Sequence, residues 1–260
     1  MIDPESLRNY FPPLLWEQQD LRKYMIKEYI QLLILDYLST TPFIKKAVFI
    51  GGTSLRLVKG IDRFSEDIDF DCKDLTDDEF IKMTDGVIQF LQRYGFKAEA
   101  RDKSVSKLQA FRRNIYFPGF LFDLGLSGYR EERFLIKIES QDQEILYEKK
   151  LTTIKGCGFY FKFNVPVDTV LCSMKISALL SRQKGRDFYD AMFLMNQTKP
   201  DFSFLSAQCG INNMSELKEA LSEMLNKVDL AHKSRDFEHL VFDKKDVRRI
   251  MMFEDFVKSL

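Results

Sequence analysis

Two short stretches decide how this chain folds and what chemistry it can carry: AVFIGGTS at positions 47–54 and SEDIDF at positions 65–70. The apolar half of the first stretch predicts a buried strand that ends in a sharp turn at its two glycines. The residues that follow, 53–58, predict a short helix. In the second stretch apolar residues alternate with acidic ones, which is the period of a strand.

The turn residues of the first stretch suit a phosphate group. Gly51 and Gly52 let the backbone approach a ligand closely and leave amide N–H groups available to phosphate oxygens. Thr53 and Ser54 continue this segment, and the Ser54 hydroxyl can add a donor. A Gly-Gly pair after a strand is, taken alone, typical of an ordinary turn.

The acidic residues of the second stretch suit a metal ion. Asp67 and Asp69 are two positions apart, so on a strand both carboxylates project from the same face. Two such carboxylates repel each other unless a cation lies between them, and oxygen ligands of this kind suit Mg²⁺, which typically also binds substrate phosphates. Alone the pattern is typical of a solvated sheet face. Beside a phosphate-binding turn, it is what nucleotidyl transfer requires.

The rest of the chain predicts an α+β fold, in which a mixed β-sheet is flanked by helices and followed by a helical C-terminal region. We expect a nucleotidyltransferase-like domain with N-terminal helices over residues 1–195, and a helical region packed on it over 196–260. The elements expected outside the two stretches are helices at 16–37, 77–94, 168–182 and 187–195, strands at 108–117 and 134–139, and a loop or hairpin at 118–133.

Composition excludes several classes of protein. The 260 residues include 39 Lys and Arg and 39 Asp and Glu, so the chain is neither a polycation nor an acidic tail, although basic residues can still gather on one face. The four cysteines and two histidines lack the spacing of a zinc site. No apolar run approaches the ~18 residues of a membrane span, and the first residues do not form a signal peptide, so we expect no membrane association and a cytoplasmic location.

The two stretches resemble a known family. GGTS at 51–54, followed by RFSEDIDF at 63–70, is similar to the first motif of the AbiEii/AbiGii toxin nucleotidyltransferases, which lie within the DNA polymerase β-type nucleotidyltransferase superfamily. A second block, KISALLSR at 175–182 followed by KGRDFYD at 184–190, is similar to that family's paired helical motifs. The resemblance covers roughly residues 47–195, and the tail beyond it carries no matching motif.

The resemblance implies an enzyme that uses two Mg²⁺ ions and an NTP. Asp67 and Asp69 would hold the metals, and residues 51–54 would bind the β- and γ-phosphates. The superfamily also implies a third metal-binding carboxylate on the strand next to the Asp67–Asp69 strand. Glu139 fits this position best, and Asp123 is its rival. Asp71, two positions beyond Asp69, is expected on the surface.

The second block would supply cationic groups. Lys175 and Arg182 lie on one face of the predicted helix, flanked by apolar residues, a placement that suits an anionic triphosphate. Lys175 would neutralise charge on the pyrophosphate leaving group, Arg182 would bind the nucleotide, and Asp187 would position Lys175 or the acceptor. In the structural alternative, Arg182 and Arg186 pair with Asp187 and Asp190 and simply join two helices.

The leading function is therefore transfer of a nucleoside monophosphate to an acceptor hydroxyl. The resemblance implies the toxin of a bacterial toxin–antitoxin or phage-defence pair, with a tRNA-like RNA as acceptor and a cognate antitoxin encoded nearby. The alternatives are a small-molecule nucleotidyltransferase of the aminoglycoside-modifying kind and a catalytically silent nucleotide- or RNA-binding module. For an RNA acceptor, phosphate contacts are expected at two basic clusters, Arg101, Lys103, Lys107, Arg112 and Arg113, and Lys244, Lys245, Arg248 and Arg249.

Overall fold

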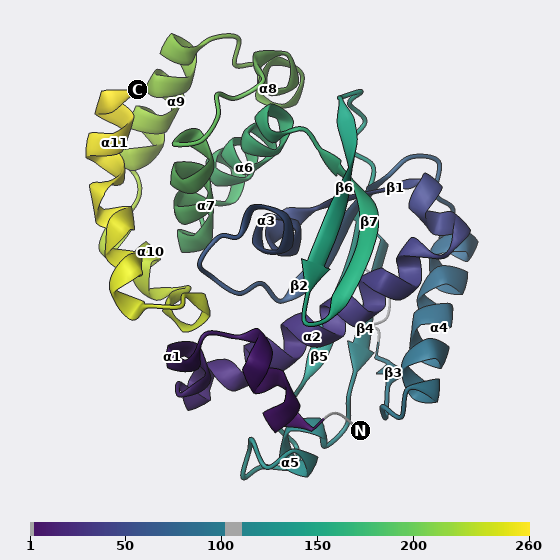
Figure 1. The fold of residues 1–260 in the computed structure, drawn as a ribbon. Helices are drawn as coiled ribbons and strands as arrows, with labels where there is room; N and C mark the ends of the chain where they lie inside the picture. Colours follow the sequence, from purple (N-terminus) through teal and green to yellow (C-terminus); the bar gives the residue numbers. More distant parts are fainter. Residues whose placement is uncertain (1–2, 102–110) are drawn as a thin grey trace. The chain divides into compact units, whose positions relative to one another are not determined.

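The computed structural model describes residues 3–101 and 111–260 (Figure 1). The chain divides into two units. The first unit takes residues up to 60, residues 64–144 and residues 151–165. The second takes residues 61–63, 145–150 and 166–260. The domain boundary expected after residue 195 falls inside the second unit. Lys103 and Lys107, two members of the first expected basic cluster, lie outside the described residues.

A five-stranded mixed sheet organises the first unit and confirms the expected fold class. Its strand order is β1-β2-β5-β4-β3, in which only β2 and β5 run parallel and the other neighbours are antiparallel. The strands are β1 (Ala47–Ile50), β2 (Asp67–Cys72), β3 (Glu99–Ala100), β4 (Phe111–Tyr116) and β5 (Leu135–Gln141).

One face of this sheet is apolar and buried. Ile68, Phe70, Ile136 and Ile138 are at most 1% exposed, because alternate residues of β2 and β5 point to the same side. Helix α4 packs against β4, where the Phe80 ring stacks on that of Phe111. The side chains that alternate with the apolar ones give the sheet a polar second face.

Helices and turns complete the first unit. Helix α3 begins directly after β1 and ends at Gly60, whose left-handed backbone (φ 72°) suits a residue without a Cβ. A short helix stands where a loop or hairpin was expected at 118–133. The helical elements are the 3₁₀ turns η1 (Pro4–Tyr10) and η2 (Pro42–Lys45), α1 (Pro13–Trp16), α2 (Gln19–Ser39), α3 (Gly51–Lys59), α4 (Asp77–Arg93) and α5 (Phe120–Asp123).

Strands β6 (Lys149–Gly156) and β7 (Phe159–Pro166) form a β-hairpin that was not expected from the sequence. Phe163 of β7 packs on the apolar face of the sheet, with its ring centroid 5.5 Å from that of Phe70 and 6.0 Å from that of Phe49. Phe159 packs on Tyr29 of α2. The hairpin therefore adds its own aromatic layer to the core of the first unit.

The second unit is mainly helical, which confirms the expected helical C-terminal region. Ile176, Phe188, Leu205 and Phe253 are fully buried in it, and the rings of Phe188 and Phe253 meet edge to face at 5.0 Å. Its elements are α6 (Asp168–Arg182), α7 (Gly185–Met195), α8 (Phe202–Cys209), α9 (Met214–Leu225), α10 (Leu230–Arg235), η3 (Glu238–Leu240), η4 (Lys244–Met252) and α11 (Phe253–Ser259). Across the described residues, no helix combines the length and apolar composition that a bilayer crossing needs.

Candidate active site

The turn between β1 and α3 brings the backbone of Gly51 against a carboxylate. Antiparallel pairing of β1 with β2 places Ile50 beside Asp69, one residue before the turn. Gly51 has a φ of +80°, and a Cβ added there would overlap the Asp69 side chain. Two separate reasons therefore require glycine at this position: the backbone conformation and the close approach of Asp69.

The start of α3 offers several hydrogen-bond donors. The first four N–H groups of a helix lack partners within the helix, and here they belong to residues 51–54. The Ser54 hydroxyl is buried and has no hydrogen-bond partner among the described residues. The Thr53 hydroxyl instead donates to the backbone carbonyl of Asp67 and fastens α3 to β2. Amides and a hydroxyl at a helix N-terminus are suited to bind phosphate oxygens.

Helix α2 holds both α3 and the segment that leads into β2. Gln31 donates to the Ser65 carbonyl at 3.1 Å, and Lys27 pairs with Glu66 at 3.1 Å, just before β2 begins. Glu28 of the same helix accepts from the Arg56 guanidinium in α3 at 2.8 Å. These contacts are largely buried, so α3 and the start of β2 are held by one rigid element.

Asp67 and Asp69 project from the polar face of β2, next to charged residues of β5. Parallel pairing sets Asp67 beside Lys137 and Asp69 beside Glu139. Lys137 Nζ lies 3.0 Å from Asp67 Oδ2 and 3.5 Å from Glu139 Oε1. Burial would lower the pKa of Lys137, but the carboxylates of Asp67 and Glu139 outweigh it and raise that pKa. Lys137 therefore stays charged and offsets the repulsion between the acids.

Glu139 stands where the third carboxylate was expected, on the strand beside Asp69. Its Oε1 forms an ion pair with Arg112 Nε at 2.5 Å, across the β4–β5 pairing. Asp123 lies at the end of α5 rather than on a strand, and it pairs with Lys97 at 3.1 Å. The geometry favours Glu139 over Asp123 as the neighbour of Asp69, and its role as a metal ligand stays a prediction.

The donor set fits Mg²⁺ bound together with a nucleotide, and the expectation of two ions stays a prediction. Among the described residues, no three His, Cys, Asp or Glu side chains gather closely enough to form a metal site by themselves. Mg²⁺, however, is commonly held by one or two carboxylates plus substrate phosphates. Asp67 and Asp69 supply two carboxylates beside the amides of α3, so phosphate oxygens are the ligands that would complete the shell.

The expected surface position of Asp71 is wrong. This residue is 6% exposed, and its carboxylate accepts from the backbone N–H of Gln143 at 3.0 Å. The carboxylate orders the chain just after β5. Sequence alternation placed Asp71 on the correct face of β2, but it did not reveal the loop that covers it.

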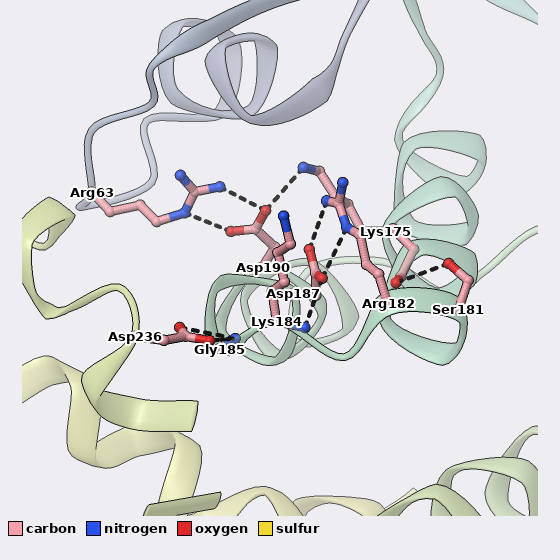
Figure 2. Close-up of polar contacts among 10 residues, drawn as sticks. Arg63, Lys175, Ser181, Arg182, Lys184, Gly185, Asp187, Asp190 and Asp236 are labelled. Atoms are coloured by element: carbon pink, nitrogen blue, oxygen red, sulfur yellow. Dashed lines mark hydrogen bonds and ion pairs between the residues drawn. The ribbon is translucent and has the colours of Figure 1, made fainter. Parts of the chain in front are cut away.

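In the second unit, Lys175 lies in a buried cluster of charges (Figure 2). Its Nζ is 2.9 Å from Asp190 Oδ2, and the same carboxylate accepts two hydrogen bonds from the Arg63 guanidinium, each 2.7 Å long. Arg63 and Asp190 are 1% exposed and Lys175 is 5% exposed. Asp190 therefore links Arg63 in the loop before β2 to helices α6 and α7.

The pKa values in this cluster follow from burial and pairing. Burial alone would raise the pKa of Asp190, but Arg63 and Lys175 outweigh it and lower that pKa to about 2. Burial lowers the pKa of Lys175, and Asp190 opposes this effect. One carboxylate thus compensates two buried cations.

Asp187 joins the end of α6 to the start of α7. It is fully buried, accepts two hydrogen bonds from Arg182 at 2.7 and 3.0 Å, and accepts from the backbone N–H of Lys184 at 3.1 Å. The pairing of Arg182 with Asp187 across the helix junction is the structural alternative considered from the sequence (Figure 2). Asp190 departs from that alternative, since its partners are Arg63 and Lys175 rather than Arg186.

Sequence reasoning missed Arg63 as a functional candidate. Its only sequence signal is its place at the start of the RFSEDIDF motif, and its partner Asp190 is 127 residues away. The neighbouring Asp62 is held in the same unit by Tyr189 at 2.8 Å and Arg249 at 3.3 Å. The short segment 61–63 is thus bound on both sides by residues of the C-terminal half.

Several residues of the two basic clusters expected to contact RNA form hydrogen bonds or ion pairs within the protein. Arg113 is buried and donates to Thr84 and Asp85, while Arg112 pairs with Glu139. Arg249 pairs with Asp62 and Asp246. All four residues of the C-terminal cluster are exposed, and Lys244, Lys245 and Arg248 form no ion pair within the described residues.

Comparisons with known proteins agree with this geometry. A family model described as "Nucleotidyl transferase AbiEii toxin, Type IV TA system" matches residues 33–240. No curated protein sequence matches the chain. Among solved structures, the MenT4 nucleotidyltransferase toxin of Mycobacterium tuberculosis H37Rv is similar at a TM-score of 0.62, with 16% identity over 100% of this chain and 91% of that one.

JHP933 of Helicobacter pylori is similar at a TM-score of 0.51, with 18% identity over 91% of this chain and 94% of that one. At these identities the structural likeness concerns the fold. The family model, in contrast, spans most of the chain and includes both motif blocks. The chain therefore belongs to the AbiEii family and is a nucleotidyltransferase of the toxin–antitoxin type.

Proposed function

We propose that this protein transfers a nucleoside monophosphate from an NTP to a hydroxyl of a tRNA-like RNA. One observation carries the proposal: Asp67 and Asp69 lie together on β2, and Asp69 rests on the Gly51 backbone at the N-terminus of α3. Carboxylate oxygens suited to bind a metal ion thereby lie beside amides suited to bind phosphate, which supports transfer of a nucleotidyl group.

Each part of this site has a distinct task. The amides of residues 51–54 and the buried Ser54 hydroxyl would hold phosphate oxygens of the NTP. Asp67 and Asp69 would hold Mg²⁺, with Glu139 as the third carboxylate. When bound, Mg²⁺ supplies a Lewis acid that stabilises negative charge on the transferring phosphoryl group.

The second motif block would contribute charge and order. We propose Lys175 as the cation that offsets charge on the pyrophosphate leaving group, on the basis of its place in the second motif block. Its ammonium is paired with Asp190 in a buried setting, so this role requires that the pair open toward the nucleotide. Arg182 would bind the nucleotide, with Asp187 fixing its guanidinium through two hydrogen bonds. The structural alternative for all three residues is helix packing, and the Lys175 variants described in the Discussion separate the two.

The cellular role would be that of a growth-arresting toxin in the cytoplasm of a bacterium. Membership of the AbiEii family supports a cognate antitoxin encoded nearby, and a phage-defence role is our extension of it. Arrest by modified tRNA would require the chain to recognise RNA directly.

The test is incubation of the purified protein with each labelled NTP, MgCl₂ and total bacterial RNA, beside reactions that contain aminoglycosides instead of RNA. Label in the tRNA band of a denaturing gel supports the proposal and identifies the NTP. Label only in the aminoglycoside reactions would establish a small-molecule transferase. No label in either set, with folded protein, would favour a silent binding module.

A further inference from the structure

The outward side of the β6–β7 hairpin carries lysines and large apolar or aromatic side chains that have no role in the proposed site. Strands β6 and β7 are joined by a two-residue turn, Cys157 and Gly158, both with positive φ. Such a turn fixes the register, so Lys155 lies opposite Tyr160 and Thr153 lies opposite Lys162. These four residues, with Leu151, form the hairpin outer face.

The other side of the hairpin is anchored in the core. Ile154 and Phe163 are fully buried, Phe161 is 6% exposed, and Phe163 stacks on Phe70. Because side chains alternate along each strand, this anchoring leaves the opposite side chains facing solvent. The hairpin outer face is therefore held on a rigid support.

Exposure and charge distinguish this face from an ordinary solvated surface. Tyr160 is 72% exposed and Leu151 is 59% exposed, although both are large side chains on one face of the same hairpin. Lys155 and Lys162 are exposed and form no ion pair within the described residues. Between positions 149 and 167 the sequence contains no Asp or Glu.

A planar aromatic ring between unpaired lysines is complementary to single-stranded nucleic acid. Lysines contact backbone phosphates, and an exposed aromatic ring offers a base a surface on which to stack, whatever the base. A protein partner for this face would need acidic residues and an apolar group over Tyr160. The absence of any acid from the hairpin favours a polyanion over a protein.

We propose that the hairpin outer face binds a single-stranded segment of the RNA acceptor, with Lys155 and Lys162 on phosphates and Tyr160 stacked on a base. The choice of RNA rests on the proposed function. The inference adds the place where the acceptor docks, at a surface separate from the two basic clusters expected from the sequence.

The experiment measures RNA binding without nucleotide or metal, so that it does not depend on catalysis. Fluorescence anisotropy reports the Kd of a fluorescein-labelled single-stranded RNA of mixed sequence, across a range of KCl concentrations. The variants are Tyr160→Ala, Tyr160→Phe and the double variant Lys155→Gln with Lys162→Gln. The matched control is Lys73→Gln with Lys82→Gln, which removes the same charge from exposed positions outside the hairpin and outside both basic clusters.

Loss of the stacking ring should weaken binding roughly 5- to 100-fold in Tyr160→Ala, while Tyr160→Phe keeps near wild-type affinity. Removal of two phosphate contacts should lower the slope of log Kd against log salt by about 1.4, at about 0.7 per contact to a single strand. The control pair should leave Tyr160-dependent binding in place and change the affinity much less than the hairpin pair.

Equal affinity in wild type and all hairpin variants would overturn the inference, as would an equal loss in the control pair. Normal RNA binding by the hairpin variants together with loss of neutralisation by the cognate antitoxin would assign the face to a protein and also overturn it. Label transfer by the wild-type protein, measured in the assay with labelled NTPs, tests the enzyme itself. Loss of RNA binding at the hairpin and loss of transferase activity are therefore distinguishable outcomes.

Discussion

Replacement of Asp190 by Asn tests the buried charge cluster most sharply. The Asp190 carboxylate pairs with Arg63 and Lys175, all three are at most 5% exposed, and the amide of Asn has nearly the same shape without the charge. Asp190→Asn therefore leaves two cations in a buried setting with no compensating anion. Removal of one partner from a buried ion pair costs about 3–5 kcal/mol of unfolding free energy.

For a chain of this size, that loss corresponds to a fall in Tm of roughly 6–20 °C at pH 7. The effect should depend on pH. The pKa of Asp190 is lowered to about 2 from an ordinary 3.8, so its charge stabilises the wild type fully above about pH 4. That contribution is lost as the pH falls from 4 toward 2, and the difference in Tm between wild type and variant should shrink over the same range.

The assay is thermal unfolding followed by circular dichroism at pH 7, 4 and 3. A compensated variant, Arg63→Met with Lys175→Met and Asp190→Leu, is the control, because removal of all three charges leaves no uncompensated ion and should restore much of the Tm. A Tm for Asp190→Asn within about 2 °C of wild type at pH 7 would refute the account of this cluster.

Four further outcomes are expected. Lys175→Ala should lower kcat on the order of 10²–10³, and Lys175→Arg should also be impaired because a planar guanidinium cannot take the place of an ammonium; turnover that falls only with the folded fraction would make Lys175 structural. Asp67→Ala and chelation with EDTA should each abolish label transfer, and transfer that survives both would exclude the metal-site proposal. Gly51→Ala should abolish transfer by displacing Asp69, whereas Gly60→Ala, with similar left-handed strain but open space around its Cβ, should only lower the Tm. Induced expression of wild type should arrest bacterial growth and Asp69→Ala should relieve the arrest, as scored by colony counts; equal arrest by both would show that arrest is not catalytic.

The parts of the fold that were predictable are those with strong local patterns. Helix α4 was expected over 77–94 and forms over Asp77–Arg93, because a capping box at Thr76 and Glu79 starts it and Gly95 follows its end. Strand β2 and helix α6 likewise follow their apolar periods. The β6–β7 hairpin was missed, since the short apolar runs of its strands lack a two-residue Asn-Gly or Asp-Gly turn, and Cys157 takes the left-handed position instead.

The candidate site was predictable where neighbours in sequence are neighbours in space. Asp67 and Asp69 share a face because they share a strand, and the turn at Gly51 follows from its glycines. The partners of these residues were not predictable, because strand pairing brings Lys137 and Glu139 to them from 70 residues away. Arg63 and Asp190 meet because the loop before β2 packs on helix α7, across a separation of 127 residues that no local pattern reports.

The central claim is that Asp69 serves the reaction and not merely the sheet. The direct measurement compares label transfer from NTP to total RNA by wild type, Asp69→Asn and Asp71→Asn, each matched for folded fraction by its thermal melt. Asp71 lies on the same strand face, but its carboxylate orders Gln143, a task that Asn can keep by accepting the same N–H. We predict that Asp69→Asn loses transfer by at least about 10²-fold while Asp71→Asn retains it. Transfer by Asp69→Asn at the wild-type rate, or an equal loss in both variants, would contradict the account.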